Sequence, residues 1–226
     1  MNDNEPQVLQ LTPEAALATM AAKVREVLAR REGRIAIGLA GGPGVGKSTL
    51  AVQLVAALNA AEPGLAAYVP MDGFHMRHAK LERLGTVRDK GMPHTFEGEA
   101  FAGFLAALKA ATGPLSGPGY SREIEDVVDD AFTVPAAARV LVAQGNYLLL
   151  ADAPWARVRP LLDLAIFLDV PRDIAKARLL KRHAEHGLFT EARNHEHVER
   201  VDLANYDLVR GSRGRANVVI ELVTEA

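Results

Sequence analysis

Short apolar runs recur along the chain and alternate with longer stretches whose apolar positions have helical spacing. The runs lie at residues 34–40, 67–71, 139–143, 164–168 and 218–222. A short apolar run bounded by turn residues indicates a strand buried on both faces. Such strands alternating with helices predict an α/β fold, a doubly wound and mainly parallel sheet with helices on both faces.

Helices are expected between these strands. The first begins at residues 12–14, where a threonine cap, a proline at the first helical position and an acidic residue follow one another. Others are expected directly after the glycine-rich stretch at 41–46 and at about residues 97–110, 171–187 and 195–209. Residues 76–96 show no clear period and are interpreted as irregular, and the breaker-rich segment 113–119 (GPLSGPG) as an active-site loop.

Composition narrows the classes of protein. The 226 residues fit one domain, and no repeat or linker divides them. The net charge of -2 lacks the basic footprint of nucleic-acid binding, and the chain has no cysteine for disulfides or thiolate metal sites. No apolar run approaches the ~20 residues of a membrane span, and the polar N-terminus does not resemble a signal peptide. We therefore expect a single cytoplasmic domain over residues 1–226 that binds neither nucleic acid nor membrane.

The strongest motif is a phosphate-binding loop. Residues 41–48 (GGPGVGKS) match G-x-x-x-x-G-K-[ST] and lie between a predicted strand and a predicted helix, which is the context that the motif requires. Glycines let backbone N–H groups point at phosphates, and the helix N-terminus favours anions. The lysine contacts the β and γ phosphates, and the serine hydroxyl can ligate Mg²⁺. The nucleotide-binding residues are therefore expected to be Gly41, Gly42, Pro43, Gly44, Val45, Gly46, Lys47, Ser48 and Thr49.

Other residues discriminate among P-loop proteins. The chain has neither the N-K-x-D nor the D-x-x-G motif of GTPases, and the apolar run 139–143 ends at Gln144 rather than at the acidic residue usual in motor ATPases. Small-molecule kinases instead combine a carboxylate at a strand end with an arginine-bearing lid. Asp72 follows the run 67–71, which we expect to adjoin the P-loop strand, and would face the ligand crevice as a catalytic base. A plain turn at Asp72-Gly73 is the alternative.

Candidate lid arginines follow the run at 164–168. Arg178 and Arg182 lie four residues apart and share a helix face, and Arg193 follows Gly187. Planar guanidinium groups on a lid at about residues 178–195 would neutralise the charge of a transferring phosphoryl group. A solvated basic helix face is the alternative.

The seven histidines do not form a recognisable metal motif. His183 and His186, and His195 and His197, are close in sequence, but there is no H-E-x-x-H pattern and no cysteine. We interpret them as surface residues of the lid. His75 is the exception, because it lies three residues after Asp72 and could contact the substrate.

Four segments together, GGPGVGKST, MDGFH, QGNYLLL followed by PW, and ARLLKRH, resemble the uridine kinase, pantothenate kinase and phosphoribulokinase group. The resemblance is greatest to bacterial nucleoside/nucleotide kinase-like proteins described as fructose-transport-system kinases, and it extends from about residue 35 to residue 222. It implies a P-loop NTPase fold with a sheet of about five parallel strands and a lid. It also implies that Asp72 is the base and associates with Mg²⁺, and that Arg178 and Arg182 are lid arginines. The acceptor would lie near His75, Tyr120, Arg122 and Tyr147, and adenine would be flanked by Arg213 and Arg215.

One position departs from the family pattern. Relatives carry a glutamate before the GNYLLL segment, whereas this chain carries Gln144. Glutamine keeps the oxygen but loses the charge, so it is a weaker partner for Mg²⁺. Activity could then depend more on Asp72 and Asp169.

The sequence therefore predicts an ATP-dependent and Mg²⁺-dependent kinase that phosphorylates a hydroxyl of a small metabolite, with Asp72, Lys47, Arg178 and Arg182 as the catalytic residues. Two alternatives stay open. One is an ATP-binding regulator, which Gln144 favours. The other is a nucleotide kinase, which would need a second basic pocket from residues such as Arg77, Arg83, Arg88 and Lys90. The acceptor, whether a nucleoside, a sugar or a pantothenate-like compound, is not identified, and a homodimer is left open.

Overall fold

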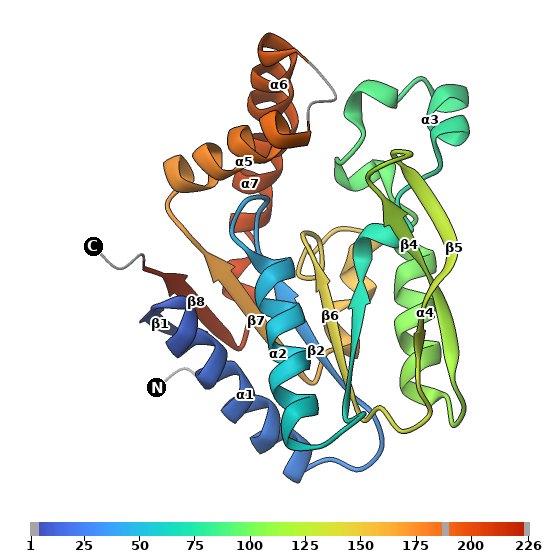
Figure 1. The fold of residues 1–226 in the computed structure, drawn as a ribbon, viewed down its shortest axis with the longest axis vertical. Coiled ribbons are helices and arrows are strands. Elements are labelled where there is room, and N and C mark those ends of the chain that lie inside the picture. Colours follow the sequence, from blue (N-terminus) through green and yellow to red (C-terminus); the bar gives the residue numbers. More distant parts are fainter. Residues whose placement is uncertain (1–4, 187–189, 224–226) are drawn as a thin grey trace.

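The computed structural model describes residues 5–186 and 190–223. Its centre is a six-stranded sheet in which every neighbouring pair is parallel, in the order β1-β8-β7-β2-β6-β3 (Figure 1). The strands are β1 (Gln7–Leu11), β2 (Ile35–Ala40), β3 (Ala66–Pro70), β6 (Val140–Gly145), β7 (Leu164–Asp169) and β8 (Val218–Leu222). A separate antiparallel hairpin consists of β4 (Leu115–Ser121) and β5 (Asp126–Val134).

The helices cover both faces of the sheet, as the apolar runs predict. They are α1 (Pro13–Ala29), α2 (Lys47–Ala61), α3 (His78–Leu84), α4 (Gly98–Ala110), α5 (Arg172–His186), α6 (Glu191–His197) and α7 (Leu203–Arg210). A π-helical turn, Val198–Asp202, joins α6 to α7. The side chain of Thr12 caps α1 by accepting a hydrogen bond from the amide of Ala15 at 3.3 Å, so the predicted helix start is confirmed.

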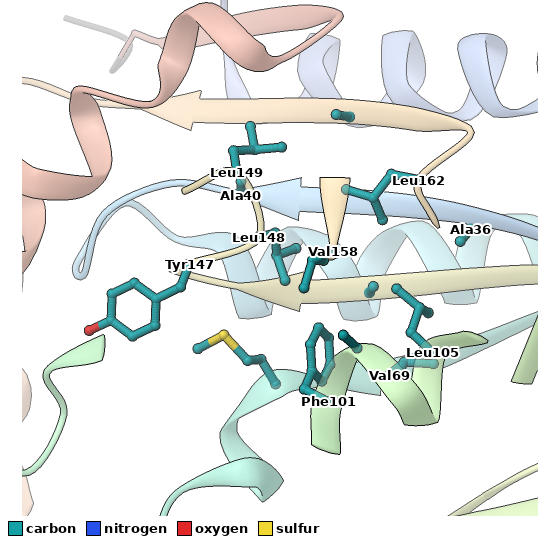
Figure 2. Close-up of a cluster of buried hydrophobic side chains, with 14 of the residues drawn as sticks. Ala36, Ala40, Val69, Phe101, Leu105, Tyr147, Leu148, Leu149, Val158 and Leu162 are labelled. Atoms are coloured by element: carbon teal, nitrogen blue, oxygen red, sulfur yellow. The ribbon is translucent and has the colours of Figure 1, made fainter. Parts of the chain in front are cut away.

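Alternate residues of the strands supply two hydrophobic layers. Ile35, Ile37 and Leu39 of β2 pack with α1 and α2 on one face. Ala36 and Ala40 face the second layer, which contains α4 and the segment 147–162. Figure 2 shows this second layer, with Phe101 and Leu105 of α4 beneath the sheet and the Tyr147 hydroxyl directed away from them. Burial on both faces explains why the strands are apolar throughout.

Three expectations about local structure need correction. The sheet has six strands rather than about five, because β1 (QVLQL) is an edge strand whose polar positions are exposed and leave no apolar run. The segment 113–119 is mostly part of strand β4 rather than a loop. Residues 76–96 are not irregular throughout, since they contain α3.

The strand order also differs from expectation. β3 does not adjoin the P-loop strand β2, because β6 lies between them and pairs with both. All three strands are parallel, so their carboxyl ends lie at the same edge of the sheet. The P-loop, Gln144 at the end of β6, and Asp72 after β3 therefore lie along one edge.

The hairpin is seated against the turn that carries Asp72. A Cβ atom added to Gly73 would lie 1.8 Å from the backbone oxygen of Pro118 in β4, so only glycine permits this approach. The stacked rings of His75 and Tyr120, with centroids 4.6 Å apart, join the same two segments. The position of the hairpin is therefore fixed relative to Asp72.

We expect Gly73→Ala to lower the free energy of unfolding by about 1–3 kcal/mol, because backbone atoms must move to relieve the overlap. Urea denaturation would measure the change. Gly103→Ala is the matched control: nothing lies within 4 Å of a Cβ at that site in α4, so alanine should be neutral or stabilising there. Equal stability of the two variants would show that the hairpin is not seated as described.

Candidate active site

The candidate site is a cleft of about 1120 Å³ at the carboxyl edge of the sheet. Its lining comes from six parts of the chain: the P-loop, the turn after β3 with the start of α3, the segment 87–96, the turn of the β4–β5 hairpin, the end of β6, and the α5–α7 region. Figure 1 shows α5, α6 and α3 standing beyond this edge of the sheet. The sequence-predicted residues that line the cleft are Pro43, Gly44, Gly46, Lys47, Ser48, Thr49, Asp72, His75, Tyr120, Arg122, Arg178 and Arg182.

The P-loop has the backbone that phosphate binding requires. Gly44 has a φ of 79°, and a Cβ atom there would lie 2.7 Å from the carbonyl oxygen of Ala175 in α5. Gly46 begins α2 without a side-chain cap, which leaves the first amides of a 15-residue helix available to an anion. Gly41, Gly42 and Val45 are buried and support the loop from beneath.

Lys47 is buried at the base of the loop. Its side chain donates a hydrogen bond to the Gly42 carbonyl oxygen at 2.7 Å, and the residue is only 6% exposed. Burial lowers the pKa of Lys47 to about 7, against the opposing charge of Asp72. Without phosphates nearby, a large fraction of Lys47 is therefore neutral at physiological pH.

Ser48 is oriented by a short network of hydrogen bonds. The Gln144 side-chain oxygen accepts one from the Ser48 hydroxyl at 3.4 Å and one from the Tyr68 hydroxyl at 2.7 Å. Burial and the charge of Asp72 raise the pKa of Tyr68 to about 12, so its phenol keeps the proton that it donates. Because Ser48 also donates its proton, the lone pairs of its oxygen stay available, as a Mg²⁺ ligand requires. The donor set fits the cation that the family resemblance implies, with one negative charge fewer than a glutamate at position 144 would supply.

His75 presents one defined nitrogen. Its Nδ1 lies 2.7 Å from the Asp72 carbonyl oxygen, which can only accept, so Nδ1 carries the hydrogen. Burial lowers the pKa of His75, which favours the neutral ring with Nε2 as a hydrogen-bond acceptor. The rings of Phe96 and Tyr120 pack against it in tilted orientations, at centroid distances of 3.9 and 4.6 Å.

The two predicted lid arginines extend from α5, which packs on the P-loop through Ala175 and Leu179. Within the described residues, neither Arg178 nor Arg182 has a carboxylate at ion-pair distance, and the Nε atom of Arg182 is buried without a hydrogen-bond partner. Burial lowers the pKa of Arg182. Residues 187–189 of the predicted lid, including Gly187, lie outside the described residues.

Two lid histidines are more ordered than the surface positions expected for them. His183 Nε2 lies 2.8 Å from a carboxylate oxygen of Asp202, and the ring of His197 lies 5.4 Å from that of His183. These three residues could reach a common cation. Burial lowers the pKa of His197, and the positive charges of Arg200 and Arg182 lower it further. A divalent ion is disfavoured there, and we interpret Asp202 as the counter-charge of the lid.

Several predicted residues lie away from the cleft lining. Tyr147 is buried, and its hydroxyl donates to the Gly91 carbonyl oxygen. Asp169 accepts hydrogen bonds from Tyr206, Arg210 and Arg213 at 3.1–3.2 Å. It is therefore engaged in a structural network. Arg213 also pairs with Glu221 at 2.9 Å.

Arg215 offers its backbone carbonyl to the Arg159 side chain at 2.8 Å. Like Arg213, it does not line the cleft.

Some residues of the site were missed from the sequence. Tyr68 lies in β3 among apolar residues, so the sequence gives no indication that its hydroxyl belongs to the site. Asn205 of α7 donates to the Gly91 carbonyl oxygen at 2.9 Å, and Arg200 pairs with Asp89 at 3.0 Å. Both contacts join the region from Val198 to α7 to the segment 87–96, and neither follows a motif. They could have been found only from the three-dimensional arrangement.

Comparison with known protein families identifies the class of P-loop protein to which the chain belongs. A protein-family model described as "Phosphoribulokinase / Uridine kinase family" matches residues 36–226 of the chain. The chain belongs to this family. The resemblance seen in the four motifs is thereby confirmed, and the protein is a P-loop kinase whose relatives support a phosphotransferase.

Individual relatives agree with this assignment. The chain is 34% identical over 201 residues to "Putative uridine kinase C227.14" of Schizosaccharomyces pombe, covering 86% of each protein. It is 33% identical over 148 residues to a pantothenate kinase of Lacticaseibacillus casei, covering 65% of this chain and 48% of that protein.

Among solved structures, a "putative fructose transport system kinase" from Silicibacter sp. TM1040 matches with a TM-score of 0.82 and 36% identity. The match covers 90% of this chain and 98% of that one. Within residues 5–186 and 190–223, no helix of the kinase combines the length and apolar character needed to cross a membrane.

We expect the affinity of the kinase for Mg·ATP to fall as pH rises above about 7. The free protein loses the Lys47 proton in this range, and phosphates raise its pKa, so binding takes up a proton. Calorimetry at pH 8 in two buffers of different ionisation enthalpy would measure this uptake. Lys47→Met should bind more weakly and take up no proton at this site. Equal uptake by both proteins would contradict the assignment.

We expect Gln144→Glu to leave ATP binding intact and to raise turnover, because a carboxylate still accepts from Ser48 and Tyr68 and adds charge for Mg²⁺. Steady-state kinetics would test it, with the exposed Gln53→Glu as the control. Unchanged or lower turnover in a normally folded Gln144→Glu protein would refute it.

Proposed function

We propose that this kinase transfers the γ-phosphoryl group of Mg·ATP to a hydroxyl of a small metabolite. One observation carries the proposal: the Asp72 carboxylate lines the same cleft as Lys47 and acts on its charge. A carboxylate so close to the phosphate-binding lysine suits the base that an attacking hydroxyl needs. The pantothenate kinase and uridine kinase names among the relatives support an alcohol acceptor.

Each residue of the cleft has a separate role in the proposed reaction. The P-loop amides and Lys47 bind the phosphates, and Ser48 supplies a ligand for Mg²⁺, which neutralises phosphate charge when bound. Asp72 accepts the proton of the acceptor hydroxyl, whose oxygen forms a bond to the γ-phosphorus. The bond from that phosphorus to the β–γ bridging oxygen breaks, and ADP leaves. Arg178 and Arg182 compensate the charge of the phosphoryl group during transfer.

A panel of acceptors tests the proposal. ADP production would be measured with uridine, cytidine, pantothenate, fructose, glycerate, ribulose 5-phosphate and nucleoside monophosphates. We expect one hydroxyl compound to raise turnover well above background. A flat panel despite tight ATP binding would contradict the proposal and favour a nucleotide-dependent regulator, and a nucleoside monophosphate as the best acceptor would favour a nucleotide kinase.

We expect Asp72→Asn to lower turnover by about 10²–10⁴-fold while ATP affinity stays nearly unchanged, because the amide cannot accept the hydroxyl proton. Turnover with the best acceptor and the Kd for Mg·ATP would be measured together. Asp152→Asn, an exposed site outside the cleft lining, is the control. Turnover near wild type in Asp72→Asn would remove Asp72 from the role of base.

A further inference from the structure

Tyr68 reaches the phosphate-binding part of the cleft from strand β3, which carries no motif at that position. In the register of β3 with β6, Tyr68 is paired with Val142, two residues before Gln144. Because side chains alternate along a strand, Val142 and Gln144 lie on one face of the sheet, and Tyr68 packs on the same face. Helix α2, which carries Ser48 in its first turn, covers this face. The side chains of Tyr68, Gln144 and Ser48 therefore meet between three elements.

The Gln144 side-chain oxygen accepts two hydrogen bonds of unequal strength. The Tyr68 hydroxyl donates at 2.7 Å, which is the optimum for an O–H···O bond. The Ser48 hydroxyl lies 3.4 Å away, where such a bond is weak. Gln144 is only 3% exposed, so little water reaches it to replace either partner. The bond from Tyr68, rather than the one from Ser48, therefore holds the amide of Gln144.

A glutamine amide has two ends of similar size and opposite hydrogen-bonding character. Its oxygen accepts hydrogen bonds, and its nitrogen only donates them. A half-turn of the Gln144 amide would place the nitrogen beside Ser48 in nearly the same volume. The nitrogen would then donate to the Ser48 oxygen and occupy a lone pair that a Mg²⁺ ligand needs. A glutamate would present an oxygen to Ser48 in either orientation.

The phenol of Tyr68 distinguishes the two orientations of the amide. Burial and the charge of Asp72 raise the pKa of Tyr68 to about 12, so the phenol keeps its proton at physiological pH. That proton has the Gln144 oxygen as its acceptor. After a half-turn of the amide, the phenol would face N–H groups instead, and its half-buried O–H would lose this partner. Leaving a buried donor without an acceptor is unfavourable, so Tyr68 favours the orientation seen in the structure.

We propose that Tyr68 is a positioning residue that holds the Gln144 amide with its oxygen toward Ser48 and so keeps the Ser48 hydroxyl free to ligate Mg²⁺. The need for it arises from the neutral side chain at position 144. The departure of Gln144 from the family pattern is then accompanied by a second residue that preserves the magnesium site. This inference goes beyond the acceptor chemistry, but it rests on the use of Mg·ATP in the proposed function.

A double-mutant cycle of Tyr68→Phe and Gln144→Glu tests the inference. For the wild type, the two single variants and the double variant, calorimetry would give the Kd of the non-hydrolysable analogue β,γ-imido-ATP with Mg²⁺ and with EDTA. The ratio of the two affinities measures the contribution of Mg²⁺ without any turnover. Tyr68→Phe alone should lower this ratio by about 3- to 10-fold, which is the effect of one hydrogen bond. In the Gln144→Glu background it should lower the ratio by about 2-fold or less.

The controls separate positioning from stability. Tyr147→Phe removes another buried phenol hydrogen bond, outside the cleft lining. It should lower stability to urea and leave the Mg²⁺ ratio unchanged. The affinity measured with EDTA should be the same in wild type and Tyr68→Phe.

Two results would overturn the inference and leave the proposed function intact. An equal fall of the ratio in both backgrounds would give Tyr68 a purely structural role. An unchanged ratio in Tyr68→Phe would show that the amide of Gln144 needs no support from the phenol. If the wild type bound the analogue no more tightly with Mg²⁺ than with EDTA, the proposed use of Mg·ATP would fail as well.

Discussion

The parallel pairing of β2, β6 and β3 is the constraint on which the site depends. It fixes the carboxyl ends of three strands along one edge, although their residues are far apart in sequence. Gln144 lies at the end of β6, Asp72 lies in the turn after β3, and Ser48 lies at the start of α2, which follows β2 and the P-loop. The apolar side chains on both faces of the sheet hold this edge in place. The packing of the sheet therefore determines where the chemical groups of the site lie.

Burial sets the electrostatic character of the site. Lys47 and Arg182 are cations that the protein itself neutralises only in part, and both have lowered pKa values because water is excluded around them. Such groups gain more from a bound anion than exposed cations would. Tyr68 and Gln144, in contrast, are uncharged. They orient the Ser48 hydroxyl without adding negative charge to the site. The buried cations and the oriented hydroxyl that would bind phosphates and Mg²⁺ are thus in place before any ligand binds.

Sequence patterns predicted the sheet, most helices and the phosphate loop, because buried strands and the loop have strong local signatures. They could not predict that β6 lies between β2 and β3, since strand order depends on how helices pack across the whole sheet. β1 was missed because an exposed edge strand needs no apolar run. The roles of Tyr68 and Asn205 were missed for a different reason: each depends on a partner distant in sequence. The structure also removed Asp169 from the candidate catalytic groups, because it is held by Arg210 and Arg213.

The carbonyl oxygen of Gly91 accepts hydrogen bonds from both Tyr147 and Asn205. One atom therefore joins the core after β6, helix α7 and the segment 87–96. A displacement of any of the three must lengthen a bond to the other two. The positions of α7 and of the segment 87–96 are then linked in free energy, and the linkage acts equally in both directions. A ligand that displaces one of these parts would therefore change the free energy needed to displace the other.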